Sequence, residues 1–231
     1  MISSLGDQIT LEIWTTWNGS GNWGRVYSFG DSVGGEGVSN QGLDWLDLIT
    51  QSGDNGLLSA DVAIDGAGTA RLLGPAPLPQ GVETHVVFVI DAVTKVNRLY
   101  INGQWITSAA IQNAWTVSGM NDINNWLGRG QWADQRYLGS FNEFRVYTGL
   151  LSQAEVATSF ARGPDQITGG VPVPLDATLQ DGVLTITWPS TTPATLQSST
   201  DLSTPGAWGT ADGTPVESNG VFSQDVPADQ D

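Results

Sequence analysis

The chain has 231 residues and contains no cysteine, which excludes disulfide bonds, thiolate zinc sites and cysteine nucleophiles. Its formal net charge is −16, a field that repels nucleic acid and anionic lipid, and no apolar run is long enough for a membrane span. We therefore expect no nucleic-acid partner and no membrane insertion. The acidic surface fits an extracellular or cell-surface protein and favours cations such as Ca²⁺, although the first residues lack the basic and apolar segments of a signal peptide.

Short β-rich runs separated by turn residues occupy the first part of the chain, and the 29 glycines and 11 prolines suit this pattern. Strands are predicted at residues 8–17, 23–29, 43–50, 57–64 and 82–91. The run at 82–91 is apolar at both odd and even positions, which is typical of a strand that is buried on both faces. It is expected to be an inner strand of a curved two-layer sandwich.

The second part of this domain contains a hairpin, a long loop, a strand and a helix. Asn102-Gly103 joins two β-rich runs and supplies the positive φ angles of a two-residue turn. Residues 111–132 are predicted to be a loop, and 137–147 a strand. Ser152 and Glu155 form a capping-box pattern that opens a short helix ending near Gly163. The predicted fold is all-β, a curved two-layer sandwich with one short helix.

Composition changes after the helix. We predict a β-sandwich domain at 1–163, a Gly/Pro-rich linker at 164–175 and a small β-sandwich-like module at 176–231. The segment that begins at residues 184–189 resembles the start of a fibronectin-III-like module. About 55 residues remain, against about 100 for a complete sandwich of this type, so the module is expected to be incomplete.

Six motifs in order resemble the laminin-G-like family of concanavalin-like jelly rolls. They lie at residues 10–14, 26–30, 84–87, 99–103, 126–128 and 142–147, so the resemblance covers about residues 8 to 163. Asn142 stands where the family usually has aspartate. The resemblance implies an all-β, two-layer antiparallel jelly-roll sandwich for residues 1–163. It also implies an extracellular adhesion or glycan-binding module, often with Ca²⁺. It carries over no catalytic or binding residue, because the fold hosts many unrelated functions.

Three charged or titratable residues lie inside otherwise apolar strands. In a fold of this family the first and last strands of the domain are neighbours, so Glu12 and Arg145 are predicted to form a buried ion pair. His85, the only histidine, is predicted to be a hydrogen-bonded core residue, although a general base or metal ligand is the alternative. No single strand carries two carboxylates on one face, which disfavours a glycosidase.

The ten tryptophans are the main candidates for ligand contact, because exposed indole rings stack on sugar rings. Several, including Trp23 and Trp45, lie at strand ends or in polar loops. The candidate ligand-binding group combines three tryptophans with hydrogen-bonding side chains: Trp115, Trp126, Trp132, Asn124 and Arg129. The alternative is that these tryptophans plug the ends of the sandwich.

Loop carboxylates are candidates for a calcium site, because Ca²⁺ takes oxygen ligands from several loops. The candidates are Asp31, Asp122 and Asp134, in a sequence without EF-hand spacing; solvated loop acids are the alternative. We therefore predict a non-catalytic extracellular module that binds carbohydrate. The alternatives are a structural or adhesion module whose partner is another surface protein, and a glycan-active hydrolase or lyase.

Overall fold

The computed structural model describes residues 2–33, 42–64, 66–112, 115–165, 175–180, 183–190, 196–198, 209–211 and 213–227. The chain divides into two compact units, Met1–Ile167 and Thr168–Asp231. This boundary lies inside the segment expected to be the linker, most of which falls outside the described residues.

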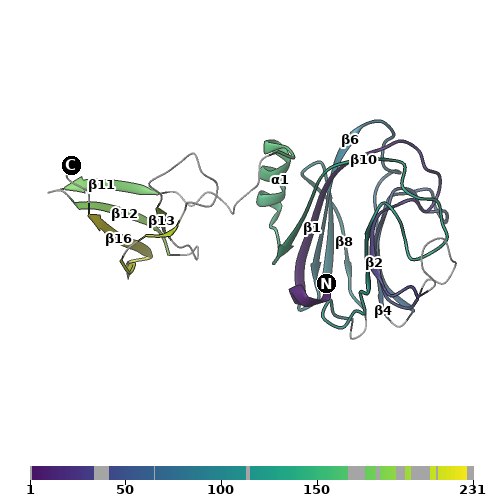
Figure 1. The fold of residues 1–231 in the computed structure, drawn as a ribbon, viewed down its shortest axis with the longest axis horizontal. Coiled ribbons are helices and arrows are strands. Elements are labelled where there is room, and N and C mark those ends of the chain that lie inside the picture. Colours follow the sequence, from purple (N-terminus) through teal and green to yellow (C-terminus); the bar gives the residue numbers. More distant parts are fainter. Residues whose placement is uncertain are drawn as a thin grey trace. The chain divides into compact units, whose positions relative to one another are not determined.

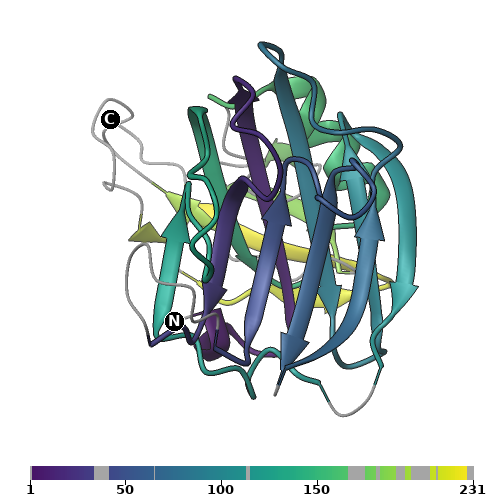
Figure 2. The ribbon, with the colours of Figure 1, turned by 90° about the vertical axis from the view of Figure 1, so that its right-hand side faces the viewer.

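The first unit contains two five-stranded antiparallel sheets (Figures 1 and 2). Sheet 1 has the order β10-β1-β6-β7-β8, and sheet 2 the order β5-β4-β3-β2-β9. The strands of sheet 1 are β1 (Gln8–Trp17), β6 (Glu83–Asp91), β7 (Val96–Ile101), β8 (Gln104–Ala110) and β10 (Gly139–Thr148). Those of sheet 2 are β2 (Arg25–Gly30), β3 (Trp45–Ile49), β4 (Ser59–Ile64), β5 (Ala67–Leu73) and β9 (Asn124–Leu127). A 3₁₀-helix, η1 (Ile2–Leu5), precedes β1.

The core fills the space between the two sheets. Alternate residues of β1 and β6 enter it, among them Leu11, Ile13 and Phe88, each of which is fully buried. The rings of Tyr27 from sheet 2 and Phe144 from sheet 1 meet with centroids 5.6 Å apart. The sandwich architecture is thus as predicted, with β6 in the middle of its sheet.

The helix α1 (Gln153–Arg162) covers the other face of sheet 1 (Figure 1). It begins with the predicted capping box, in which Ser152 and Glu155 exchange side chain-to-backbone hydrogen bonds. Val156 packs with Val87, Val89 and Tyr100 in a second apolar cluster. This helix explains why β6 is apolar on both faces: one face meets sheet 2 and the other meets α1.

Two strands of the first unit were not expected from the sequence. Residues 111–132 were predicted to be a loop, but Asn124–Leu127 forms β9 at the edge of sheet 2, where it pairs with β2. Strand β5 pairs with β4 at the opposite edge. The Asn102-Gly103 turn is confirmed, with φ angles of 48° and 75° joining β7 to β8.

The second unit contains a four-stranded sheet, β11-β12-β16-β15, and a two-stranded sheet, β13-β14. Its strands are β11 (Asp176–Gln180), β12 (Val183–Pro189), β13 (Gln197–Ser198), β14 (Gly209–Thr210), β15 (Val216–Ser218) and β16 (Val221–Pro227). Trp188 is buried in this unit against Phe222. No helix among the described residues has the length and apolar character needed to cross a bilayer.

Deleting residues 166–231 should leave a first unit that folds by itself. The two sheets, their core and α1 all lie before residue 166, so the deletion removes none of the contacts described for them. We expect a single cooperative transition in urea, followed by circular dichroism and by tryptophan fluorescence with coincident midpoints. An insoluble or molten product would show that the second unit covers part of the first core.

Candidate functional site

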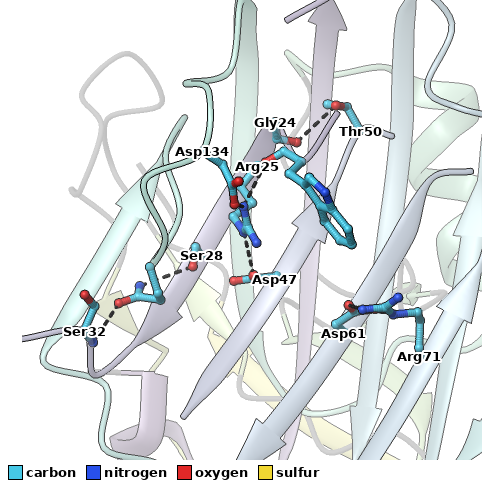
Figure 3. A network of polar contacts seen from close by, with 11 residues as sticks. Gly24, Arg25, Ser28, Ser32, Asp47, Thr50, Asp61, Arg71 and Asp134 are labelled. Carbon is cyan, nitrogen blue, oxygen red and sulfur yellow. Dashed lines mark hydrogen bonds and ion pairs between the residues drawn. The ribbon is translucent and has the colours of Figure 1, made fainter. Parts of the chain in front are cut away.

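The outer face of sheet 2 carries charged side chains at its centre. On β3 the inward positions are Leu46 and Leu48, so Trp45 and Asp47 point to the opposite face. Asp61 of β4 lies directly across from Asp47, and Arg71 of β5 lies across from Asp61. Asp47, Asp61 and Arg71 therefore form a row across β3, β4 and β5 on the outer face of sheet 2 (Figure 3).

Arg25 of β2 is held by two carboxylates. Its Nε donates to Asp47 Oδ2 at 2.8 Å, and its Nη1 donates to Asp134 Oδ2 at 2.5 Å and to the Trp23 carbonyl at 2.9 Å. The arginine is only 3% exposed. Gly130 allows this arrangement, because a Cβ there would lie 2.0 Å from Arg25 Cδ. The loop that carries Asp134 therefore passes directly over Arg25 (Figure 3).

Arg71 is also held by two carboxylates. Its Nε and Nη2 bind the Asp61 carboxylate at 2.8–3.0 Å, and its Nη1 donates to Asp54 Oδ2 at 2.6 Å. The Asp61 side chain is 7% exposed, whereas those of Arg71 and Asp54 are 40% and 61% exposed. Arg71 thus bridges the buried Asp61 carboxylate and the exposed Asp54 carboxylate at the rim of the sheet.

Three half-buried tryptophans surround these ion pairs. The rings of Trp45 and Trp132 meet edge to face with centroids 5.1 Å apart, and the Arg25 guanidinium lies 4.3 Å from the Trp132 ring. Trp23 lies between the two arginines, at 6.0 Å from Arg25 and 5.8 Å from Arg71. Together with Ile49 they line a cavity of about 280 Å³ on the outer face of sheet 2.

Burial changes the protonation of the carboxylates in this cavity. Burial raises the pKa of Asp61 to about 6, and the Arg71 charge only partly opposes this effect. The pKa of Asp47 is also raised by burial, against the opposing charge of Arg25. The pKa of Arg71 is raised, because its two carboxylate partners outweigh the effect of burial. Two carboxylates with raised pKa values in one cavity are typical of a functional site.

The structure separates the tryptophans that sequence analysis grouped together. Trp132 lines the cavity. Trp115 is fully buried in the core and is therefore not a ligand contact, so its assignment to the binding group was wrong. Trp126 lies on β9, where the Arg129 guanidinium sits 3.8 Å from its ring. Neither Trp126 nor Arg129 lines the cavity.

Asn124 is held in hydrogen bonds within the protein and does not line the cavity. Its Nδ2 donates to the Ser32 carbonyl at 2.6 Å and approaches Gln131 Oε1 at 3.3 Å. The Gln131 side chain in turn accepts from the Ser32 amide at 3.0 Å and donates to the Ser28 hydroxyl at 3.2 Å. These bonds attach the loop after β9 to β2 and so position Trp132 and Asp134.

The three carboxylates considered for calcium do not form one ligand set. Asp31 accepts from the amides of Leu43 and Asp44, and Asp122 accepts from residues of the N-terminal 3₁₀-helix. Asp134 is paired with Arg25. Within the described ranges no three acidic or histidine side chains lie together as metal ligands. These residues do not fit a calcium site, and calcium binding by the protein stays a prediction.

The predicted contact between Glu12 and Arg145 is present beneath α1. Arg145 Nη1 lies 3.3 Å from Glu12 Oε2, and the two residues are in register between β1 and β10. Glu12 is fully buried and also accepts from Tyr147 at 2.6 Å and from His85 Nε2 at 2.9 Å. His85 is thus a hydrogen-bonded core residue, as predicted, with its ring 4.3 Å from that of Trp14.

Most of the cavity is not predicted by the sequence. A pair of carboxylates was expected only on a single strand, whereas Asp47 and Asp61 are opposite each other on neighbouring strands. The usable signal was an isolated charge inside an apolar strand, the same signal that identified Glu12 and Arg145. Asp47, within Trp45–Ile49, and Asp61, within Ser59–Ile64, both have it.

Solved structures with a similar fold include glycan-binding domains. The CBM40 domain of the Ruminococcus gnavus IT-sialidase, bound to α2,3-sialyllactose, is 21% identical with a TM-score of 0.54; the match covers 66% of this chain and 82% of that one. Domain 4 of AbnA, a GH43 extracellular arabinanase from Geobacillus stearothermophilus in complex with arabinotriose, is 22% identical with a TM-score of 0.50, covering 66% of each chain. At these identities the likeness establishes the fold alone.

A larger enzyme also contains this fold. The NanB sialidase from Streptococcus pneumoniae matches 81% of this chain with 20% identity and a TM-score of 0.55, but only 31% of its own length is covered. No curated protein sequence matches the chain.

The family assignment rests on the sequence of the first unit. Residues 3–157, more than half of the chain, match the family described as the concanavalin A-like lectin/glucanases superfamily. The match leaves the second unit unassigned, so its likeness to a fibronectin-III module stays a prediction. The two-sheet sandwich agrees with this match, and the chain belongs to the concanavalin A-like lectin/glucanase superfamily.

Proposed function

We propose that this protein is a non-catalytic carbohydrate-binding module whose ligand binds in the cavity on the outer face of sheet 2. The observation that carries the proposal is the set of half-buried rings of Trp23, Trp45 and Trp132 around hydrogen-bonding carboxylates and guanidinium groups. Indole rings pack against the C–H faces of sugars, and the charged groups bind hydroxyls. The cavity lies on a rigid sheet, which positions these groups before the ligand arrives.

The fold supplies a reason for this location. Helix α1 covers the outer face of sheet 1, and the apolar cluster of Val87, Val89, Tyr100 and Val156 fills that interface. Sheet 2 has its charged row and tryptophans on its outer face instead. Structural neighbours bind sialyllactose and arabinotriose on the same fold, which supports a glycan as ligand.

Trp132→Ala and Trp45→Ala should each weaken glycan binding. The loss of one sugar–indole stack should cost about 1–2 kcal/mol, a factor of roughly five to thirty in Kd. Binding is measured by calorimetry with a glycan first identified on an array. The melting temperature of each variant is recorded as well, because both rings also pack against each other and Trp132 packs on Arg25.

Trp105→Ala is the matched control. Trp105 is 55% exposed on β8 in sheet 1 and takes no part in the cavity, so its removal should leave Kd unchanged. Trp126→Ala tests the edge of sheet 2 considered from sequence. If Trp126→Ala abolishes binding while Trp45→Ala and Trp132→Ala leave it intact, the site is at β9 and the cavity is not the binding site.

Glycan cleavage is a second candidate function, with one observation in its favour. Asp47 and Asp61 lie opposite each other in the cavity, and a carboxyl with a pKa of about 6 is suited to act as a general acid. Against it, each carboxylate is already bound by an arginine. Chromatography of the array-identified glycan after prolonged incubation decides between the two: cleavage products that Asp61→Asn abolishes would make the protein an enzyme.

We also propose an extracellular or cell-surface location for this module. The neighbouring arabinanase domain belongs to an extracellular enzyme, and the acidic surface of this chain agrees with such a setting. A structural or adhesion role with a surface-protein partner is the alternative if no glycan binds.

A further inference from the structure

The cavity on sheet 2 and its rim carry more carboxylates than guanidinium groups. Its two guanidinium groups, Arg25 and Arg71, are each bound by two carboxylates. The four carboxylates are Asp47, Asp54, Asp61 and Asp134, so the six groups carry a net charge of −2 when all are ionised (2 − 4). A ligand that enters the cavity therefore meets an excess of negative charge.

No other cation lines this cavity. The protein has eight lysine and arginine residues, and all eight lie within the residues that the structure describes. Besides Arg25 and Arg71 they are Lys95, Arg98, Arg129, Arg136, Arg145 and Arg162, none of which lines the cavity. The second unit contains no lysine or arginine.

We propose that the cavity accepts uncharged glycans and excludes glycans that carry a carboxylate or sulfate at the bound sugar. This inference rests on the proposed carbohydrate-binding function. An anionic sugar would have to displace a carboxylate from Arg25 or Arg71, and at the short range of such contacts the remaining carboxylates would repel it. A sugar hydroxyl can donate to the more exposed carboxylates, Asp54 and Asp134, without breaking an ion pair. The ligand class thus differs from the sialyllactose bound by a neighbour of the same fold.

A matched pair of probes tests the exclusion directly. Glycans that differ only by an acidic sugar, such as lactose and α2,3-sialyllactose, are compared on one array with neutral oligosaccharides, arabinotriose among them. We expect binding to be confined to neutral members, with at least about tenfold weaker binding whenever the acid is added to a bound neutral glycan, which is about 1.4 kcal/mol. Sialylated glycans that bind better than their neutral counterparts would overturn the exclusion while leaving the proposed function in place. No binding of any glycan would overturn both.

A gain-of-function variant adds a second test. In Asp54→Asn/Asp134→Asn, each arginine loses one carboxylate partner, and both changes are at partly exposed side chains whose loss leaves the core intact. The six groups then carry no net charge (2 − 2). The ratio of Kd for the acidic glycan to that for its neutral counterpart should fall at least about tenfold, because each arginine then has one anionic partner fewer to compete with the ligand's acid group.

The control variant removes the same total charge elsewhere. Asp176→Asn/Glu217→Gln changes two exposed residues of the second unit. It should leave the ratio of the two Kd values unchanged, whereas an equal change in this control would mean that the overall charge of the protein, and not the cavity, excludes anions. Addition of 0.5 M NaCl checks this assignment, because salt screens distant charges more than contacts inside the cavity.

Discussion

Replacing Arg145 by leucine should lower the free energy of unfolding by about 3–5 kcal/mol, because it leaves a buried carboxylate without its cation. Glu12 is fully buried, and Arg145 contacts it at 3.3 Å. The same guanidinium also binds the Glu143 carboxylate through two hydrogen bonds of 2.8 and 2.9 Å. One side chain therefore neutralises two acids, and leucine replaces neither interaction.

Arg145 also connects the sandwich to its helix. It donates to the Ser159 hydroxyl in α1 and to the Pro164 carbonyl just beyond it, and it lies 4.6 Å from the Trp14 ring. Hydrogen bonds from His85 and Tyr147 outweigh the effect of burial and hold the pKa of Glu12 below its usual value, so the acid stays charged. The variant should therefore lose native contacts of α1 as well as global stability, and hydrogen exchange of the helix amides measures that loss.

Two further variants separate charge from packing at this position. Glu12→Leu/Arg145→Leu removes both charges and should recover a large part of the loss, since a buried ion pair replaced by apolar groups is often tolerated. Arg162→Leu, at an exposed position of α1, should change the unfolding free energy by less than about 0.5 kcal/mol. The free energy of unfolding of each variant is measured in urea. A decrease of less than about 1 kcal/mol for Arg145→Leu would contradict the role assigned to this ion pair.

The wild-type protein should lose about 3 kcal/mol of stability relative to Asp61→Asn when the pH is raised from about 3.5 to 7. The pKa of Asp61 is raised from 3.8 to about 6 in the folded state, because burial penalises the charged form more than Arg71 stabilises it. Between these two values the folded protein binds more protons at Asp61 than the unfolded chain does. This component of stability is therefore complete below pH 3.8 and is lost as the pH rises through about 6.

The difference between the two proteins is the quantity to measure. Other carboxylates titrate in the same range, and those with lowered pKa values, such as Asp91 and Asp122, act in the opposite direction at lower pH. They are present in both proteins and cancel in the comparison. Parallel profiles for wild type and Asp61→Asn would show that Asp61 titrates normally.

Protonation of Asp61 should also change which glycans the cavity binds. Arg71 loses the charge of its buried partner when Asp61 is protonated, while Asp54 remains at the rim. The charge balance of the cavity thus becomes less negative below pH 6, which should weaken its exclusion of acidic glycans. The pH at which binding is measured therefore has to be stated with each Kd.

Local sequence signals determined much of the framework. A β-rich run followed by turn residues predicted β1 at residues 8–17, the Asn102-Gly103 pair specified the hairpin, and Ser152 with Glu155 specified the start of α1. These features depend on residues that are close in sequence, so their physical cause is visible there. The burial of β6 on both faces was also evident, because its central residues 86–90 are all apolar and so offer no face suited to solvent.

The cavity was decided by tertiary structure alone. Arg25, Asp47, Asp61 and Arg71 are up to 46 residues apart (71 − 25), and only strand pairing brings them onto one face. The tryptophans show the same limit: Trp115 and Trp132 lie in similar polar sequence, yet one is in the core and the other lines the cavity. An indole ring suits both places, because it combines a large apolar surface with one polar group, and its surroundings are set by which sheet face it meets.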